Sequence, residues 1–146
     1  MQIETIHHVS LPVSDLARAR DFYVGVLGLE PIPRPEFPFE GAWFRVGNST
    51  LHLIVPEASD VPTYRRDKAI DSHDAHFAIR VTNYSKALAH LESRGYRPSS
   101  ERNPTPTEDN PRPMRVSATG RAGFPQIYIL DPDRNVIEIN AATAHG

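Results

Sequence analysis

Four ionisable side chains stand out because they occur at matching places in two similar stretches of the chain. His8 begins the segment HVSLPVSD, and His76 begins the segment HFAIRVTN at an offset of 68 residues. His52 and Glu138 each lie between two apolar residues in a later segment of the same two stretches. Apolar residues alternate with all four side chains, as is typical of strands with one face against a helix. Because successive strand residues point to opposite sides, we expect all four on the face away from the helix.

Three imidazoles and one carboxylate are ligands that suit a divalent first-row metal ion. Zn, Ni, Fe, Mn and Co all accept this donor set, with water or substrate at the remaining positions. A metal would also stabilise Glu138, because a buried carboxylate without a partner is costly. Taken singly, a histidine on a strand is more often an ordinary hydrogen-bonded residue than a ligand, and only the repeat favours a metal site. The predicted metal ligands are His8, His52, His76 and Glu138.

The elements that position these side chains repeat as well. A strand is predicted over 6–13, followed by a helix with Ser14 as N-cap that ends at Gly28, and then by strands over 42–47 and 50–55. The second copy has a strand from His76, a helix that ends at Gly95, and strands over 126–130 and 135–140. The fold class is therefore α+β, with one module over about 1–56 and another over about 73–142, joined by 57–72. The simplest packing places a helix on one face of each part of a shared or paired sheet, so that the other face curves around a cavity.

Three further residues are predicted to contact a substrate. Trp43 and Tyr128 precede the strands that carry His52 and Glu138 at similar places. Arg121, between two glycines, is a candidate for binding an anion, with an ordinary solvated arginine as the alternative. It lies in the segment 99–123, which is rich in proline and long for a connection, so we predict either a mobile lid or a surface loop there.

The composition excludes several classes of function. The chain has 146 residues, of which 39% are hydrophobic and 23% charged, which suits one folded domain. A net charge of −2 excludes a surface for wrapping nucleic acid or anionic lipid, and no apolar run is long enough to cross a membrane. The chain has no cysteine and its first residues do not have the pattern of a signal peptide, which favours a cytoplasmic protein.

The motifs together resemble a known superfamily. They are the opening His8-Val-Ser-Leu-Pro-Val-Ser-Asp, the helix end at Leu27-Gly28-Leu29, and Asp131-Pro-Asp-Arg-Asn-Val-Ile-Glu138. The sequence resembles the vicinal oxygen chelate superfamily, which includes glyoxalase I, fosfomycin- and bleomycin-resistance proteins, methylmalonyl-CoA epimerase and extradiol dioxygenases. The resemblance covers nearly the whole chain. It implies paired βαβββ modules that form a cup-shaped mixed sheet with the helices outside, and a metal bound in the cup by His8, His52, His76 and Glu138.

What the resemblance implies for function is broader than one reaction. We expect a metal-dependent enzyme that chelates adjacent oxygens of a small substrate, of lyase, isomerase or dioxygenase type, with Glu138 and His52 as catalytic residues. Glyoxalase I usually has a carboxylate or amide where His52 stands, so glutathione-dependent glyoxalase activity is expected to be poor. The alternatives are a metal-free binding protein of the bleomycin-resistance type and a thiol transferase of the fosfomycin type. A homodimer is expected, with no nucleic-acid or membrane partner.

Overall fold

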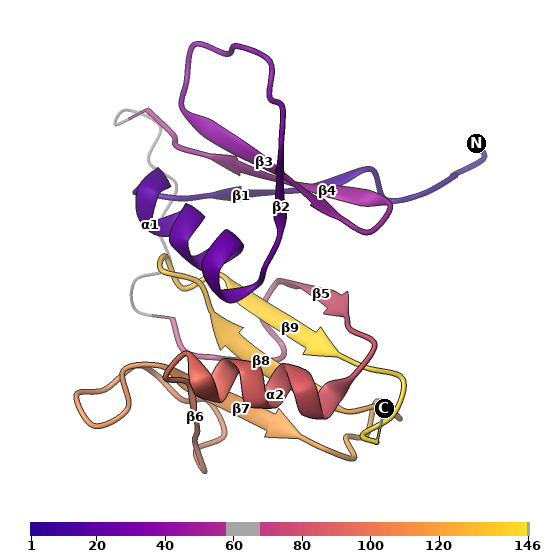
Figure 1. The fold of residues 1–146 in the computed structure, drawn as a ribbon, viewed down its shortest axis with the longest axis vertical. Helices are drawn as coiled ribbons and strands as arrows, with labels where there is room; N and C mark the ends of the chain where they lie inside the picture. The colour runs from indigo at the N-terminus through magenta and orange to yellow at the C-terminus, as the bar shows by residue number, and fades with distance from the viewer. Residues whose placement is uncertain (58–67, 146) are drawn as a thin grey trace. The chain divides into compact units, whose positions relative to one another are not determined.

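The chain divides into two compact units, Met1–Tyr64 and Arg65–Gly146 (Figure 1). The structure, a computed structural model, describes residues 1–57 and 68–145. The division falls in the stretch 57–72 that was predicted to join two modules, and most of that stretch lies outside the described residues. Each unit has its own sheet, and each is considered by itself below.

The first unit contains a four-stranded mixed sheet. Its strand order is β1-β4-β3-β2, with β1 parallel to β4 and the other pairs antiparallel. The strands are β1 (His8–Pro12), β2 (Glu30–Ile32), β3 (Gly41–Val46) and β4 (Ser49–Ile54). β2 is a short edge strand within the proline-rich stretch that follows the helix, and prolines are tolerated at sheet edges.

The helix of this unit changes its hydrogen-bonding pattern halfway. It begins as α1 (Leu16–Arg20) and continues as a π-helix, η1 (Asp21–Val26). Asp15 caps it by accepting a hydrogen bond from the backbone N–H of Arg18 at 3.0 Å, so the prediction of Ser14 as N-cap was wrong by one residue. Gly28 follows the C-cap with φ 70°, a conformation that glycine adopts without steric strain.

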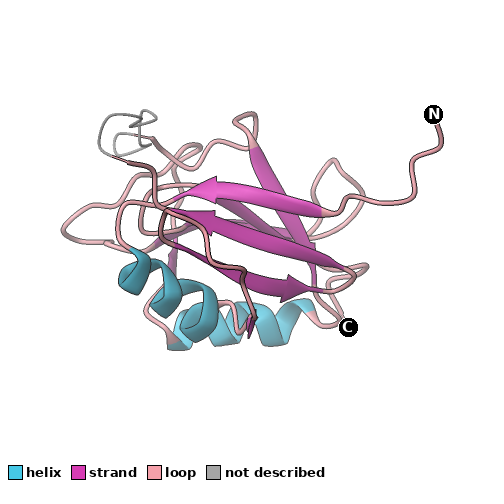
Figure 2. Ribbon diagram, turned by 90° about the horizontal axis from the view of Figure 1, so that it is seen from above, coloured by secondary structure: helices cyan, strands magenta, loops and turns pink. Residues whose placement is uncertain are grey.

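The helix of the first unit buries one set of apolar side chains. Ala19, Phe22 and Tyr23 are buried, and the Tyr23 ring lies 6.1 Å from the ring of Phe44 on β3. Figure 2 shows the helices beside the sheets. The core of the unit is completed by alternate residues of β4, among them Leu51 and Leu53, so the other set of strand residues faces away from the helix.

The second unit has the same plan with one additional strand. Its strand order is β5-β9-β8-β7-β6. β5 is parallel to β9, whereas β8 is antiparallel to both β9 and β7. The elements are β5 (His76–Arg80), α2 (Tyr84–Ser93), β6 (Arg97–Pro98), β7 (Pro113–Ser117), β8 (Gln126–Leu130) and β9 (Val136–Asn140). Together, the two mixed sheets and the few helices confirm the predicted α+β class with βαβββ modules.

The strand registers show the repeat residue by residue. In each unit a row of directly paired residues crosses three strands. The row in the first unit is Ser10, His52 and Trp43, and the row in the second is Ala78, Glu138 and Tyr128. His52 and Glu138 therefore occupy equivalent positions in their sheets, and so do Trp43 and Tyr128.

The segment 99–123 is not a single long loop. Residues 113–117 form β7, and β7 pairs with β8 through Arg115 opposite Tyr128. The part before β7 is held as well, since the backbone carbonyl of Pro104 accepts a hydrogen bond from Ile70 at 2.9 Å. The prediction of a lid over the whole of 99–123 was therefore wrong for β7, because an added sheet strand is paired along its backbone. Within the described parts of the chain, no helix has the length and apolar character needed to cross a membrane.

Loss of the N-cap of α2 should destabilise the second unit. The side chain of Asn83 accepts a hydrogen bond from the backbone N–H of Lys86 at 2.9 Å. Replacing Asn83 by Ala should lower the free energy of unfolding by about 1 kcal/mol, because that N–H loses its partner, whereas Asn83→Asp should retain nearly full stability. Urea denaturation followed by circular dichroism measures both variants. Equal midpoints for Asn83→Ala and the wild type would contradict the capping role.

Candidate functional site

His76 and Glu138 meet across the parallel strands β5 and β9 of the second unit. Nε2 of His76 lies 3.1 Å from Oε2 of Glu138. The side chain of Glu138 is 7% exposed and that of His76 is 22% exposed, so the pair is accessible mainly from the imidazole side. Glu138 is the acidic residue in a strand whose other members are apolar or amide residues. The structure thus brings together the two site residues predicted for this unit.

Two amide side chains hold the other carboxylate oxygen of Glu138. Gln126 Nε2 and Asn140 Nδ2 each donate a hydrogen bond to Oε1 at 2.9 Å. Burial by itself raises the pKa of the carboxyl, but the hydrogen bonds from Gln126, Asn140, Tyr128 and His76 outweigh it and lower the pKa below its ordinary value. Glu138 is therefore a carboxylate at neutral pH in spite of its burial.

The orientation of His76 is set from its other nitrogen. Nδ1 lies 2.7 Å from the backbone carbonyl oxygen of Asp74, which only accepts, so Nδ1 carries the proton of this hydrogen bond. In the neutral ring Nε2 then has a lone pair and no proton. It faces a carboxylate oxygen that likewise has lone pairs and no proton. A contact of 3.1 Å between them requires a cation, which is either a second proton on the ring or a metal ion.

Tyr128 is the neighbour of this pair on β8. It is directly opposite Glu138, and its ring centroid lies 5.6 Å from that of His76. Burial, the charge of Glu138 and a hydrogen bond to Glu138 raise the pKa of Tyr128 to about 12, against a smaller lowering by Arg115. The phenol is therefore protonated at neutral pH and remains a hydrogen-bond donor beside the carboxylate.

Sequence analysis did not single out the polar residues that surround the pair. Gln126 and Asn140 stand two residues from Tyr128 and Glu138 on the same strands, so strand parity was an available signal for both. Arg80 extends the network, since its Nε donates to Oδ1 of Asn140 at 2.9 Å and turns the amide group of Asn140 toward Glu138. Arg115 was missed as well, because it lies in the segment 99–123, which was predicted to be a lid or a surface loop.

In the first unit, His8 and His52 are stacked on one another. Their ring centroids are 4.2 Å apart with an angle of 14° between the planes. Trp43 also stacks on His52. Its ring centroid lies 4.1 Å from that of His52, and the two ring planes form an angle of 5°. The prediction that Trp43 contacts a substrate is untested, but its indole and His52 share one side of the sheet.

Hydrogen bonds orient these two imidazoles. Nδ1 of His8 lies 2.8 Å from Nδ1 of His7, so one of the two atoms carries the shared proton, and Nε2 of His52 lies 3.0 Å from Oγ1 of Thr50. Burial, followed by the positive charges of His8, His7 and Arg34, lowers the pKa of His52 below 6.5. At neutral pH His52 is uncharged and has a basic nitrogen.

The His76–Glu138 pair has the spacing and the donor atoms of two ligands of one metal ion. Two ligands at about 2.1 Å from one metal ion lie roughly 3.0–3.4 Å apart, and His76 Nε2 and Glu138 Oε2 are 3.1 Å apart. Imidazole nitrogen and carboxylate oxygen are ligands that first-row metals accept. Among the described residues, no three His, Asp or Glu side chains gather into a metal cluster by themselves. The structure thus forms two pairs, His8 with His52 and His76 with Glu138, and the predicted set of four stays a prediction.

Arg121 stands apart from these contacts. It lies in the turn between β7 and β8, exposed, and makes no hydrogen bond or ion pair with any residue that the structure describes. Its predicted substrate contact stays a prediction. Among the described residues, two arginines lie on the sheet face that carries Glu138: Arg80, which donates to Asn140, and Arg115, directly opposite Tyr128.

The sequence was compared with protein families and curated proteins. Residues 5–139 match the family described as the Glyoxalase/Bleomycin resistance protein/Dioxygenase superfamily. The chain is 35% identical over 102 residues to a mitochondrial methylmalonyl-CoA epimerase of Bos taurus. The aligned region covers 66% of this chain and 57% of that protein. It is 28% identical over 141 residues to Glyoxylase I 4 of Arabidopsis thaliana, covering 95% and 71%. The chain thus spans little more than half the length of the epimerase.

Solved structures show the same fold. A glyoxalase family protein from Bacillus anthracis superposes with a TM-score of 0.71 at 24% identity, covering 97% of both chains. A lactoylglutathione lyase from Agrobacterium tumefaciens superposes with a TM-score of 0.64 at 21% identity, covering 97% of this chain and 96% of that one. At these identities the likeness concerns the fold alone.

Protonation of His52 should be visible in the fluorescence of Trp43, the single tryptophan. An imidazolium stacked on an indole quenches its emission, and the pKa of His52 is lowered by burial. In protein freed of metal by a chelator, a pH titration should show a quenching step with its midpoint below 6.5. His52→Gln should remove the step, and His90→Gln on α2 should leave it unchanged. A step that survives in His52→Gln would contradict the assignment.

Proposed function

Because the chain belongs to the Glyoxalase/Bleomycin resistance protein/Dioxygenase superfamily, we propose that it is a metal-dependent enzyme acting on a small carbonyl compound. The proposed reaction moves a proton at the carbon next to a carbonyl or carboxylate group, which places the enzyme among isomerases or lyases. The proposed metal ligands are His8, His76 and Glu138, with His52 as a fourth ligand or as the base.

The observation that carries the metal dependence is the contact between His76 and Glu138. Both facing atoms are lone-pair donors once Nδ1 of His76 donates to Asp74, and their separation of 3.1 Å fits two ligands of one ion. Gln126 and Asn140 hold the second carboxylate oxygen and so direct Oε2 toward the imidazole. Hydrogen bonds from neighbouring residues to a metal-ligating side chain are typical of metal sites.

In the proposed mechanism a bound divalent ion supplies Lewis-acid stabilisation of the negative charge on the substrate oxygen. The residues of the chain perform the remaining steps. His52, neutral because burial lowers its pKa, takes the proton from the substrate carbon through a ring nitrogen and can return it. Tyr128, whose phenol keeps its proton, donates a hydrogen bond within the site, and its hydroxyl is held in place by a hydrogen bond from Gln126 Nε2.

A neutral His52 supports proton transfer. It occupies in the first sheet the position that Glu138 has in the second, and the two are paired to Trp43 and Tyr128 respectively. An epimerisation needs a proton to leave a carbon and return to it, which a neutral imidazole can carry out. The relatives named as a methylmalonyl-CoA epimerase and a glyoxylase I support a substrate with a carbonyl group.

We propose further that the chain acts in the cytoplasm as a homodimer. The absence of cysteine fits a reducing compartment. In the described sheets β1 and β5 each pair with one strand only, and an edge strand with unpaired backbone groups is a surface on which a second chain can add. The molar mass in solution, compared with 16.3 kDa for one chain, tests the dimer.

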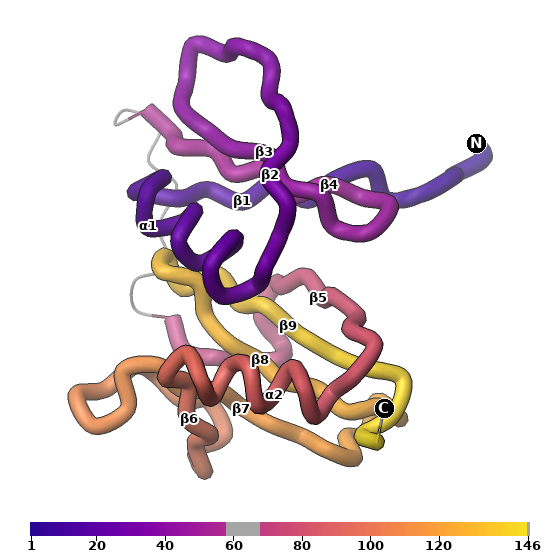
Figure 3. The backbone as a smooth tube through the Cα atoms, in the orientation of Figure 1, coloured from indigo at the N-terminus to yellow at the C-terminus, as the bar shows by residue number. Residues whose placement is uncertain are grey.

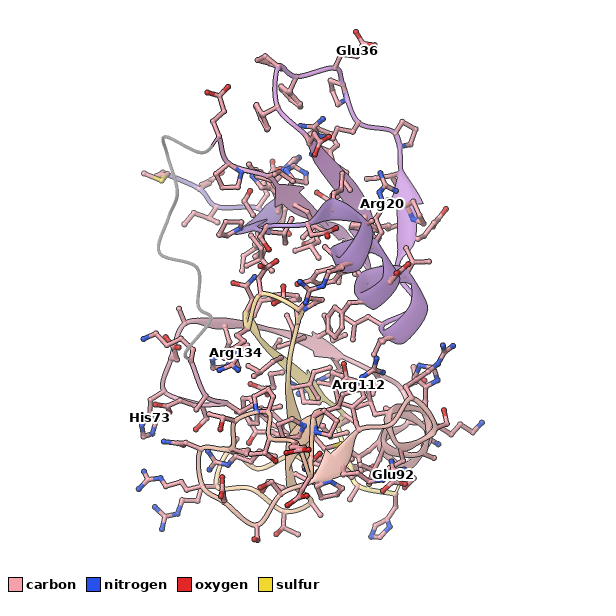
Figure 4. All side chains as sticks on the ribbon, turned by 90° about the vertical axis from the view of Figure 1, so that its left-hand side faces the viewer. Arg20, Glu36, His73, Glu92, Arg112 and Arg134 are labelled. Atoms are coloured by element: carbon pink, nitrogen blue, oxygen red, sulfur yellow. The ribbon has the colours of Figure 1, made fainter. Side chains whose placement is uncertain are left out.

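Replacing Glu138 by Gln should weaken metal binding without unfolding the protein. The amide keeps an oxygen to accept from Gln126 and Asn140, and its NH₂ group can donate to Nε2 of His76, but the charged ligand is lost. We expect an affinity for Zn²⁺ lower by on the order of 100-fold, measured by competition with a chromophoric chelator. Glu92→Gln on the outer surface of α2 (Figure 4) is the control and should bind as the wild type does. Unchanged affinity of Glu138→Gln would exclude Glu138 as a ligand.

Solvent deuterium should enter the substrate at the carbon next to the carbonyl. Metal-loaded protein in D₂O with methylmalonyl-CoA should exchange that proton, as followed by proton NMR, and His52→Gln should slow the exchange by about 10²–10⁴-fold because the base is lost. His90→Gln is the matched control. The hemithioacetal of methylglyoxal and glutathione should be a poor substrate, since His52 replaces the usual carboxylate or amide.

Two results would contradict this function. One is the absence of exchange above the uncatalysed rate for both compounds with fully metal-loaded protein. The other is an exchange rate that His52→Gln does not change, which would remove His52 from the reaction.

A further inference from the structure

An arginine enclosed by aromatic rings lies in the loop between β2 and β3 of the first unit. This loop, residues 33–40, projects well beyond the sheet (Figure 3). The guanidinium carbon of Arg34 lies 4.7 Å from the ring centroid of Phe37 and 5.0 Å from that of Phe39, and the two rings stack at 5.2 Å. These contacts hold a cation against the faces of two phenyl rings.

The charge of Arg34 is not balanced by a carboxylate within the described residues. Among the described residues, the guanidinium makes one hydrogen bond, from Nη2 to the backbone carbonyl of Phe39 at 2.9 Å, which leaves donors of the fork unused. The nearby Arg45 pairs with Glu30 at 3.8 Å. Glu36, at the outer end of the loop, points away from the unit (Figure 4). A half-buried guanidinium with unused donors is suited to bind an anion.

The sheet leaves room for this guanidinium. A Cβ atom at Gly41, the first residue of β3, would lie 3.0 Å from both Nε and Nη2 of Arg34 and still closer to the backbone oxygen of Leu53. Because Gly41 has no side chain, Arg34 lies directly against the strand backbone. Its position is therefore fixed from one side by β3 and from the other by the two phenyl rings.

The aromatic surface continues from the loop to the candidate site. Phe37 lies 6.2 Å from Trp43, Trp43 stacks on His52, and His52 stacks on His8. Phe37 is 42% exposed, which is unusual for a ring that also contacts three other groups. This row of aromatic rings lies next to the guanidinium of Arg34, which no carboxylate of the described residues balances. The positive charge of Arg34 also helps to lower the pKa of His52.

We propose that Arg34, Phe37 and Trp43 form a recognition subsite for a planar ring that carries a carboxylate group. The guanidinium fork binds the carboxylate through the donors that the protein leaves unused, and the ring packs against the side chains of Phe37 and Trp43, neither of which is fully buried. Nothing in this subsite requires a metal. Only the statement that this ring and its carboxylate form a non-reacting part of the substrate rests on the proposed function.

The single tryptophan gives a direct readout of this subsite. Protein treated with a chelator and labelled with ¹⁵N is titrated with benzoate, while the indole N–H signal of Trp43 is followed by NMR. Benzoate should shift this signal in a saturable way. Benzamide, which is planar but neutral, and cyclohexanecarboxylate, which is charged but not planar, should each bind at least several-fold more weakly.

Variants separate the contributions of charge and ring. Arg34→Gln should weaken benzoate about tenfold, Arg34→Lys should be intermediate because the charge stays and the fork is lost, and Phe37→Leu should weaken benzoate several-fold. Arg20→Gln on the exposed surface of the first helix is the matched control and should leave binding unchanged. Circular dichroism verifies that each variant folds.

Three results would overturn the proposal. They are an indole signal that benzoate does not shift, equal affinities for benzoate and benzamide, and an affinity for adenosine monophosphate above that for benzoate, which would assign the subsite to a phosphate. The titration uses metal-free protein, so its failure leaves the metal site and the deuterium exchange untouched. Conversely, loss of metal binding in Glu138→Gln would not alter the benzoate result.

Discussion

The buried carboxylate of Glu138 is the constraint around which the polar side of the second unit is arranged. A charge at this depth is tolerated only if it is stabilised, and the chain supplies two amide donors to Oε1, one from Gln126 on β8 and one from Asn140 on β9. Arg80 donates a hydrogen bond to the amide oxygen of Asn140 and so fixes the orientation of that amide. The result is a carboxylate kept ionised by hydrogen bonds, with one oxygen directed at the lone pair of His76.

The first unit uses the same strand register for different chemistry. His52 takes the place that Glu138 has in the second sheet, and Trp43 takes the place of Tyr128. The neighbours of His52 are stacked rings and positive charges, which keep it neutral, whereas the neighbours of Glu138 are hydrogen-bond donors, which keep it charged. One repeated backbone plan thus carries a base on one sheet and an anionic ligand on the other. An unbalanced Arg34 beside the first of these adds a means to recognise a charged substrate.

Much of this arrangement could be predicted from alternation along the strands. The period of two placed His8, His52, His76 and Glu138 on the faces away from the helices, and the structure pairs them within each unit as that parity requires. Parity cannot predict which neighbours complete a hydrogen-bond network, because that depends on register between strands that are distant in the sequence. The donors Gln126 and Asn140 were therefore overlooked although both lie on the predicted face.

Other features had no sequence signal or a misleading one. The prolines of 99–123 indicated a loop, yet Pro113 begins β7, a position where its missing N–H costs no ladder hydrogen bond. The change from α- to π-helix at Asp21 and the choice of Asp15 over Ser14 as cap depend on packing and geometry that local propensity does not encode. Arg134 adopts φ 62° in a turn where glycine is the easier residue, while the Asp131 carboxylate accepts two backbone hydrogen bonds across that turn.

The central claim is that His76 and Glu138 of the second unit are ligands of one divalent ion. Anomalous diffraction from crystals of the protein grown with Zn²⁺, recorded on both sides of the zinc absorption edge, tests it most directly. The account predicts one strong peak bonded to Nε2 of His76 and Oε2 of Glu138. A map in which zinc lies only at surface histidines such as His73 or His145, with His76 and Glu138 still in direct contact, would contradict it.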